Sequence, residues 1–200
     1  AEEITLSQTS YAAKILEKMG MTDCNIMHTP MENRLKLSKE SKAYAVDRTQ
    51  YRSVVGSLRY LIHTRPDLSY SVGFVSRFME KPTAEHMTTV KHILRYVKGT
   101  LNLGCSYKRF RESDPQLLGC SDSDLAGDID DRKSTSGVLF YFGGCPVSWS
   151  SQKQKIVAQS SCEAEYVAAA SAASQGIWLG RLVGELLGQQ QARWTLRVDN

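Results

Sequence analysis

Residues 117–199 carry a pattern of apolar segments and carboxylates that restricts the folds open to this chain. An apolar segment ends in Asp122, a second one ends in Asp199, and an alanine-rich helical segment with Glu165 lies between them. Parallel strands need a long crossover connection, usually a helix, and such connections are right-handed. The pattern therefore predicts an α/β fold with a mixed sheet and a crossover helix, which brings the three carboxylates to one edge.

The same region predicts the other elements of this domain. Ser160 and Glu163 have the spacing of a capping box, which gives Glu163 a structural role at the start of the helix and leaves Glu165 without one. Gly176 is expected to break this helix before a leucine-rich stripe. Apolar segments bounded by turn residues predict strands at 117–122, 137–142, 145–151, 155–159 and 194–198.

Three carboxylates at one sheet edge suit a metal-dependent chemistry. Mg²⁺ is a hard cation that prefers oxygen ligands, and two such ions about 4 Å apart can activate water and stabilise the leaving oxygen in phosphodiester cleavage. Asp122, Glu165 and Asp199 are therefore the candidate catalytic residues and ligands of two Mg²⁺ ions, with Mn²⁺ as a substitute and Asp124 as an additional candidate ligand. The alternative is a common arrangement of surface acids at the ends of strands and a helix.

Residues 1–110 differ from the rest of the chain in the spacing of their apolar residues and in their charge. They hold 17 Lys and Arg against 10 Asp and Glu, whereas residues 111–200 hold 8 against 11. This asymmetry indicates a polyanion held by the first half and metal held by the second; ordinary scatter of solvated charge is the alternative. Apolar residues at helical spacing predict helices at 7–19, 48–62, 67–79 and 84–98, with a long irregular connection at 22–48.

A row of cations marks the last of these helices. Lys91, Arg95 and Lys98 recur at i, i+4 and i+7 beside its core face, and such a stripe can follow the phosphates of a nucleic acid. A solvated helix face has much the same pattern, so the stripe alone leaves both interpretations open. Residues 111–116 are polar and turn-forming, and they are the expected linker between the two halves.

Composition argues against several classes of protein. No stretch approaches about eighteen consecutive apolar residues, so no membrane span is expected, and the first residues do not resemble a secretory signal. The five cysteines are scattered and form no C-x-x-C pair, which argues against a zinc site and a disulfide framework. An intracellular location, in the cytoplasm or the nucleus, is therefore expected.

Ordered motifs throughout the chain resemble those of one family. They are YRSVVGSLRYL at 51–61, TRPD at 64–67, SRFM at 76–79, RYVKGT at 95–100, SDSDLAGD at 121–128, DRKSTSG at 131–137, SSCEAEY at 160–166 and VDN at 198–200. On these motifs the chain resembles the C-terminal part of a Ty1/copia-type retrotransposon Pol polyprotein. The similar part is the end of the reverse transcriptase followed by most of its ribonuclease H domain.

The resemblance implies a ribonuclease H-like fold for residues 117–200, preceded in residues 1–110 by a mainly helical thumb or connection segment of the reverse transcriptase. It implies Mg²⁺-dependent hydrolysis of the RNA strand of RNA–DNA hybrids during reverse transcription. The implied partners are the RNA–DNA hybrid, the template–primer duplex and the remainder of the Pol polyprotein. Arg132 and Lys133, in one of the shared motifs, join the predicted nucleic-acid contacts.

Residue by residue, the family's metal-binding acids fall on Asp122, Glu165 and Asp199. Glu165 is preferred over Glu163 because two residues and then paired alanines follow it, as in the family. Asp122 is preferred over Asp124 because it directly follows a hydroxyl residue at a strand end. The order Asp–Glu–Asp matches ribonuclease H, whereas related transposase and integrase sites place their Glu last.

The chain also departs from the family. The polymerase palm with its paired aspartates is absent, so this chain alone is not expected to polymerise DNA. Leu125 stands where the family usually has Trp, and a fourth metal-site residue is expected beyond Asn200, in a longer polyprotein of which this chain would be a piece. Two alternatives stay open: a non-catalytic nucleic-acid-binding remnant, and a copia-derived protein with another use, such as a secreted effector-like protein.

Overall fold

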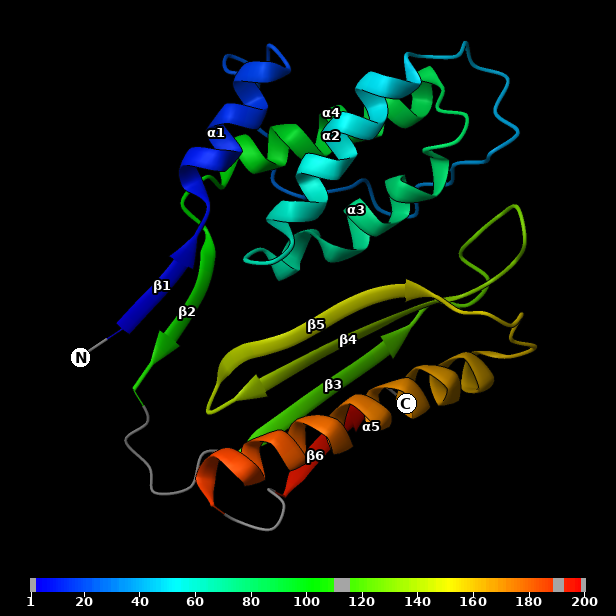
Figure 1. The fold of residues 1–200 in the computed structure, drawn as a ribbon. Helices are drawn as coiled ribbons and strands as arrows, with labels where there is room; N and C mark the ends of the chain where they lie inside the picture. Colours follow the sequence, from blue (N-terminus) through cyan, green and yellow to red (C-terminus); the bar gives the residue numbers. More distant parts are fainter. Residues whose placement is uncertain (1–2, 110–115, 189–192, 199–200) are drawn as a thin grey trace. The chain divides into compact units, whose positions relative to one another are not determined.

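The chain folds into two compact units in the computed structural model, which describes residues 3–109, 116–188 and 193–198 (Figure 1). The helical unit is Leu6–Cys105, and the sheet unit is Ser106–Asn200 together with Ala1–Thr5. The predicted linker at 111–116 lies outside the described residues except for Gln116. The expected mixture of helices with a mixed sheet is confirmed.

The helical unit is built from four helices around one apolar core. They are α1 Thr9–Lys18, α2 Arg48–Leu61, α3 Ser69–Val75 and α4 Ala84–Gly99. Two short 3₁₀ segments, Pro66–Leu68 and Ser76–Phe78, flank α3, so the helix predicted at 67–79 is regular only in its middle. Fully buried side chains from α2, α3 and α4 meet in the core, among them Tyr51, Leu58, Val72 and Leu94.

Local capping explains where these helices begin and end. The Asp47 carboxylate accepts a hydrogen bond from the Thr49 backbone N–H at the start of α2, over 2.8 Å. Thr83 and His86 form a capping box at the start of α4, and His86 is completely buried there. Gly20, with φ of +62°, follows the C-cap residue Met19 and ends α1.

A two-stranded ribbon, β1 Glu3–Ser7 with β2 Gly104–Lys108, was not expected from the sequence. The boundary between the two units passes through both strands, at Thr5/Leu6 and at Cys105/Ser106. Gly104 permits the close approach of the strands, because a Cβ atom at this position would overlap the Leu6 carbonyl oxygen.

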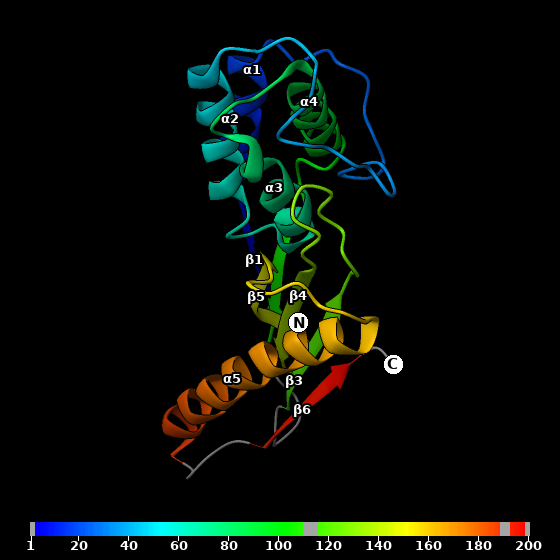
Figure 2. The same cartoon turned by 90° about the vertical axis from the view of Figure 1, so that its right-hand side faces the viewer.

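The sheet unit holds four strands and one long helix. The strands are β3 Leu117–Ser123, β4 Thr135–Phe142, β5 Cys145–Lys153 and β6 Trp194–Val198, and the helix is α5 Ser161–Leu187. The strand order is β5-β4-β3-β6, with β6 parallel to β3 and the other pairs antiparallel. Figures 1 and 2 show α5 running along one face of this sheet.

The contact face of α5 consists of small residues, which let the helix lie close to the strands. Ala164, Ala168 and Ala172 are fully buried. The predicted helix break at Gly176 is wrong, since α5 is continuous through this residue. A Cβ atom on Gly176 would lie 2.6 Å from the Trp194 ring, so the glycine provides the space that this indole fills.

The strand predicted at 155–159 is also wrong. These residues form an irregular connection in which Ile156 and Val157 are exposed. The connection carries the chain from the end of β5, an edge strand, to the start of α5 at Ser161, so its apolar residues find no neighbouring strand. Among the described helices, none has both the length and the hydrophobicity that crossing a membrane requires.

Candidate active site

Asp122 lies one residue before the end of β3. Its side chain is exposed, whereas Ser121 before it is buried. Within the described part of the chain, no hydrogen bond or ion pair occupies the Asp122 carboxylate. The position therefore presents a free carboxylate close to the end of the strand.

Glu165, near the start of α5, reaches to the end of β3. Its Oε1 atom accepts two hydrogen bonds from Ser123, one from the backbone N–H and one from the hydroxyl, each over 3.0 Å. Its Oε2 atom is buried and has no hydrogen-bond partner among the described residues. Ser123 directly follows Asp122, so β3 and α5 bring Glu165 against the residue next to the first predicted acid.

Glu163 has the structural role that the sequence predicts. The Ser160 hydroxyl accepts a hydrogen bond from the Glu163 backbone N–H over 3.1 Å, which caps α5. The Glu163 carboxylate accepts one from the Gln159 backbone N–H over 2.7 Å, one residue earlier than in an ideal capping box. The carboxylate of Glu163 is thus held at the helix start, and that of Glu165 is directed to the sheet.

The Glu165 Oε2 atom and the Asp122 carboxylate have the chemistry that a hard divalent cation requires of its ligands. A buried carboxylate oxygen without a donor is costly unless a proton donor or a cation binds it, and carboxylates are ligands that Mg²⁺ prefers. Val198, the last described residue of β6, is the register partner of Ser121, and Asp199 lies outside the described residues. Among the residues that the structure describes, no three acidic, His or Cys side chains form a metal-binding group.

Asp124 is engaged in the turn that follows β3. Its carboxylate accepts a hydrogen bond from the Thr135 backbone N–H over 2.5 Å, and its own backbone N–H donates to the Thr135 carbonyl over 3.2 Å. Gly127 packs so closely on this carboxylate that a Cβ atom there would overlap it. The observed contacts of Asp124 hold the loop, and a role in metal binding stays a prediction.

The loop between β3 and β4 contains an ionic cluster that the sequence analysis did not identify. Lys153 at the end of β5 lies 2.6 Å from the Asp128 carboxylate and 2.8 Å from that of Asp131. Only 6% of Asp128 is exposed. Burial opposes ionisation of Asp128, but the hydrogen bonds from Lys153 and from the Asp130 backbone lower the pKa of this carboxyl below its usual value.

This cluster fixes the backbone around the predicted nucleic-acid contacts Arg132 and Lys133. Arg132 is exposed and has φ of +59°, a left-handed conformation that is uncommon for residues other than glycine. Its backbone N–H donates to the Asp128 carbonyl over 2.9 Å. Lys133 is half-buried and its ammonium lies 3.9 Å from Asp131. The loop therefore holds Arg132 outward on a constrained backbone.

The cationic stripe on α4 has internal partners. The Arg95 Nε atom donates to the Asn25 carbonyl over 2.7 Å, and Lys98 donates to the Cys24 carbonyl over 2.6 Å. Lys91 is exposed. Two members of the stripe thus anchor the segment that follows α1 within the helical unit, and nucleic-acid contact by the stripe stays a prediction.

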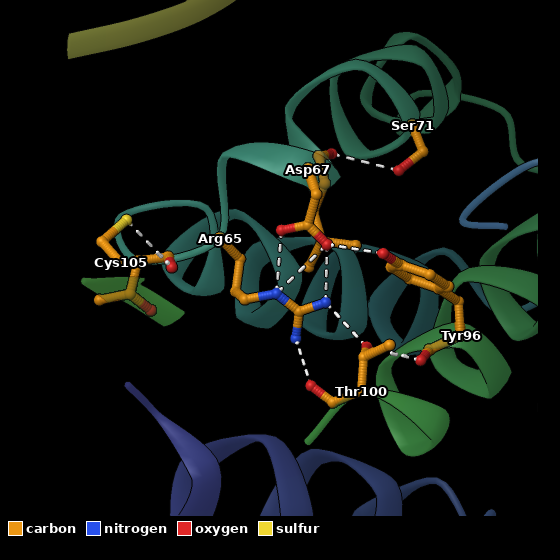
Figure 3. A network of polar contacts seen from close by, with 8 residues as sticks. Arg65, Asp67, Ser71, Tyr96, Thr100 and Cys105 are labelled. Atoms are coloured by element: carbon orange, nitrogen blue, oxygen red, sulfur yellow. Dashed lines mark hydrogen bonds and ion pairs between the residues drawn. The ribbon is translucent and has the colours of Figure 1, made fainter. Parts of the chain in front are cut away.

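A buried arginine network in the helical unit also escaped the sequence analysis, in which residues 64–67 appeared only as one of the shared motifs (Figure 3). Only 3% of Arg65 is exposed; its guanidinium pairs with Asp67 over 2.7 Å and donates to the Thr100 carbonyl over 2.9 Å. The Tyr96 hydroxyl donates to Asp67 over 3.0 Å. Burial of the phenol, with the negative charge of Asp67, raises the pKa of Tyr96. The network ties the segment between α2 and α3 to the end of α4.

Comparison with known proteins places the chain in a family. It is 43% identical over 207 residues to the retrovirus-related Pol polyprotein from transposon TNT 1-94 of Nicotiana tabacum, and 45% identical over 181 residues to that from transposon RE1 of Arabidopsis thaliana. These matches cover 100% and 90% of this chain, which spans 15% and 12% of the two relatives. It is also 44% identical over 130 residues to the secreted RxLR effector protein 161 of Plasmopara viticola, a match that covers 64% of this chain and 90% of that protein.

No family model matches the chain. No solved structure matches it either. The similarity to two transposon polyproteins, at more than two-fifths identity over nearly all of this chain, carries the assignment. The chain belongs to the family of retrovirus-related Pol polyproteins of Ty1/copia-type transposons.

Proposed function

We propose that residues 117–200 are a ribonuclease H-like domain that hydrolyses the RNA strand of RNA–DNA hybrids with Mg²⁺, as part of a reverse-transcribing Pol polyprotein. The observation that carries this proposal is the Glu165 carboxylate. Ser123 holds one of its oxygens, and the other is buried without a partner among the described residues, next to the end of the strand that bears Asp122. The parallel strand β6 leads toward the third acid of the proposed set, Asp199.

The three acids would share one task in the proposed site, which is to hold the metal. Asp122, Glu165 and Asp199 would hold Mg²⁺, or Mn²⁺ in its place. Bound there, the metal would activate a water molecule and stabilise the leaving oxygen of the phosphodiester. The double hydrogen bond from Ser123 fixes the orientation of the Glu165 carboxylate, so that its second oxygen keeps one direction. Such preorganisation lowers the reorganisation needed when the charged groups bind.

The basic residues would hold the duplex. Arg132 and Lys133 lie on the loop that follows β3, the strand of Asp122. Lys91, Arg95 and Lys98 lie on α4, where the exposed Lys91 and the guanidinium nitrogens that Arg95 does not use toward Asn25 remain for phosphate contacts. Phosphate contacts of this kind weaken as salt concentration rises. The hybrid, the template–primer duplex and the remainder of the polyprotein are the proposed partners.

A cleavage assay tests this function directly. The chain, extended past Asn200 with the sequence of its polyprotein, is incubated with a labelled RNA–DNA hybrid in Mg²⁺ and then in EDTA. Cutting of the RNA strand is expected in Mg²⁺ alone, and Asp122→Asn and Glu165→Gln should each remove it. Glu185→Gln, which changes an exposed acid on the same helix as Glu165, is the matched control and should cut normally.

A second candidate follows from the similarity to the secreted effector protein, of which this chain covers 90%. In that case the copia-derived chain would have a function other than reverse transcription, and its acidic residues would not catalyse cleavage of nucleic acid. Hybrid binding without cleavage by the unaltered chain would support a non-catalytic binding role. Absence of both binding and cleavage would favour the effector-like alternative.

A further inference from the structure

We propose that Gln154 is a positioning residue for Glu165, an inference that rests on the proposed function of the site. Gln154 follows the last residue of β5, and only 6% of it is exposed. Glutamine side chains are mostly exposed in proteins. The burial of Gln154 at the start of the connection to α5 therefore has to be explained by the contacts that its side chain makes.

The side-chain amide of Gln154 joins the sheet to the first turn of α5. Its Nε2 atom donates to the Ser136 hydroxyl over 3.0 Å and to the Ala164 carbonyl over 2.9 Å. Its backbone N–H donates to the Ser134 carbonyl over 2.8 Å, which fixes the base of the side chain. Ala164 is fully buried and directly precedes Glu165.

This bridge lies beside the one that Glu165 itself makes. Ser136 on β4 is the register partner of Ser123 on β3. One bridge therefore runs from Ser136 through Gln154 to Ala164, and the other runs from Ser123 to Glu165. Paired positions of neighbouring strands thus hold consecutive residues of one helical turn. Two attachment points restrict rotation of the turn about its axis, and this rotation is what would move the Glu165 carboxylate.

The remaining atoms of Gln154 suggest that the amide is not present for packing alone. Its Oε1 atom is buried and has no hydrogen-bond partner among the described residues. An apolar side chain of similar length would fill the same space without that cost. The two hydrogen bonds from Nε2 are what an apolar side chain could not supply, since one ends on Ser136 of β4 and the other on Ala164, the residue before Glu165.

The test compares metal affinity in the full chain. Gln154→Met keeps the size of the side chain and removes the bridge, and Gln152→Met makes the same change at an exposed position of β5. Residues that orient a metal ligand typically change metal affinity by about 10- to 100-fold when they are altered. Calorimetric titration with Mg²⁺ should therefore show a dissociation constant raised at least about 10-fold by Gln154→Met and unchanged by Gln152→Met.

Stability is measured in EDTA on the same proteins to separate positioning from folding. A purely structural Gln154 would lower the melting temperature and leave the Mg²⁺ dissociation constant of the folded protein unchanged, and this result overturns the inference. If Gln154→Met does not fold, Ser136→Ala removes the strand end of the bridge instead. A raised Mg²⁺ dissociation constant in Ser136→Ala supports the inference, and an unchanged one overturns it.

The outcome for the unaltered chain distinguishes the two proposals. If that chain binds Mg²⁺ and cuts the hybrid, but the Gln154 variants bind Mg²⁺ equally well, only the positioning role fails. If the unaltered chain neither binds Mg²⁺ nor cuts, the proposed function fails, and the positioning role fails with it.

Discussion

At the scale of single residues, two glutamates of α5 show how neighbours in sequence separate into different roles. Glu163 accepts a hydrogen bond from the Gln159 backbone and stays at the helix start, whereas Glu165 crosses to Ser123. The first contact stabilises the helix through a cap and a favourable dipole interaction. The second leaves a carboxylate oxygen buried without a partner among the described residues. A residue that costs stability in this way is typical of functional sites.

Glutamine in place of these two residues should therefore have opposite effects on stability. In EDTA, Glu165→Gln should raise the free energy of unfolding by about 1 kcal/mol, because an uncharged amide costs less to bury without a partner than a carboxylate does. Glu163→Gln should lower it by about 0.5 kcal/mol, through the weaker cap. Urea unfolding followed by circular dichroism measures both. Equal destabilisation by the two substitutions would contradict the inference that the buried carboxylate of Glu165 costs stability.

Local sequence signals predicted the residues that act on their own helix, and missed those that act at a distance. The N-cap at Ser160 was predictable because it is decided within a few residues. Arg65 and Lys153 were not, since their partners Thr100 and Asp128 are remote in the sequence. Of the candidate site, the contrast between Glu163 and Glu165 could be predicted, whereas the contact with Ser123 required the fold.

At the scale of elements, the packing of α5 depends on Gly176, which the sequence pattern predicted to be a helix break. Alanine normally stabilises a helix interior relative to glycine by about 1 kcal/mol. At Gly176 a Cβ atom would press on the Trp194 ring at 2.6 Å, so Gly176→Ala should instead destabilise the sheet unit by about 1–3 kcal/mol. Gly56→Ala in α2, where no atom lies within 4 Å of the new Cβ, should stabilise the helical unit. Thermal unfolding that shows Gly176→Ala to be stabilising would refute the close packing of α5 on β6.

The ionic cluster behind the loop after β3 should give the sheet unit a dependence on pH. The pKa of Asp128 is lowered in the folded protein, so its pairing with Lys153 stabilises the fold above the unfolded pKa of about 3.9 and is lost as pH falls through the folded value. Lys153→Met should lower the free energy of unfolding at pH 7 by about 2 kcal/mol, less than for a fully buried pair because Lys153 is partly exposed.

The difference in stability between Lys153→Met and the unaltered chain should shrink as pH falls below about 4, because the carboxyl of Asp128 gains its proton first in the unfolded chain and only at lower pH in the folded one. Urea unfolding at pH 7 and pH 3 measures it. Lys155→Met, which removes an exposed cation from the neighbouring connection, is the control and should show little effect at either pH. An equal loss of stability at both pH values would show that Lys153 acts through packing of its aliphatic chain and not through its charge.

The elements that sequence analysis missed or misplaced share one cause, which is pairing between distant segments. β1 and β2 pair across nearly 100 residues of sequence. The need for glycine at position 104 is apparent only from the structure, in which the Leu6 backbone lies beside it. Residues 155–159 have the composition of a strand but no strand to pair with. β6 was predicted correctly because its apolar alternation is strong, and its parallel pairing with β3 follows from the length of α5 between them.

At the scale of the whole molecule, two separate hydrophobic clusters stabilise the chain. The cluster of the helical unit is large and includes Tyr51, Leu58 and Leu94. The fully buried members of the other cluster are Leu117 and Phe140, with Leu179 nearly so. The two clusters share no residue. Because burial of apolar area is the main stabilising term, the sheet unit, with the smaller cluster, should be the less stable of the two.

Core truncations should therefore act on one unit at a time. Leu58→Ala should destabilise the helical unit by about 3 kcal/mol, and Phe140→Ala should destabilise the sheet unit by about 3–5 kcal/mol. Hydrogen exchange of the full chain, read by mass spectrometry, should show faster exchange in α1–α4 for the first variant and in β3, β4 and α5 for the second. Faster exchange throughout the chain in either variant would mean that the two units unfold as one. Confinement of the Phe140→Ala effect to the sheet unit would mean that the proposed site depends for its stability on a small core of its own, which leaves it the more sensitive of the two units to substitution.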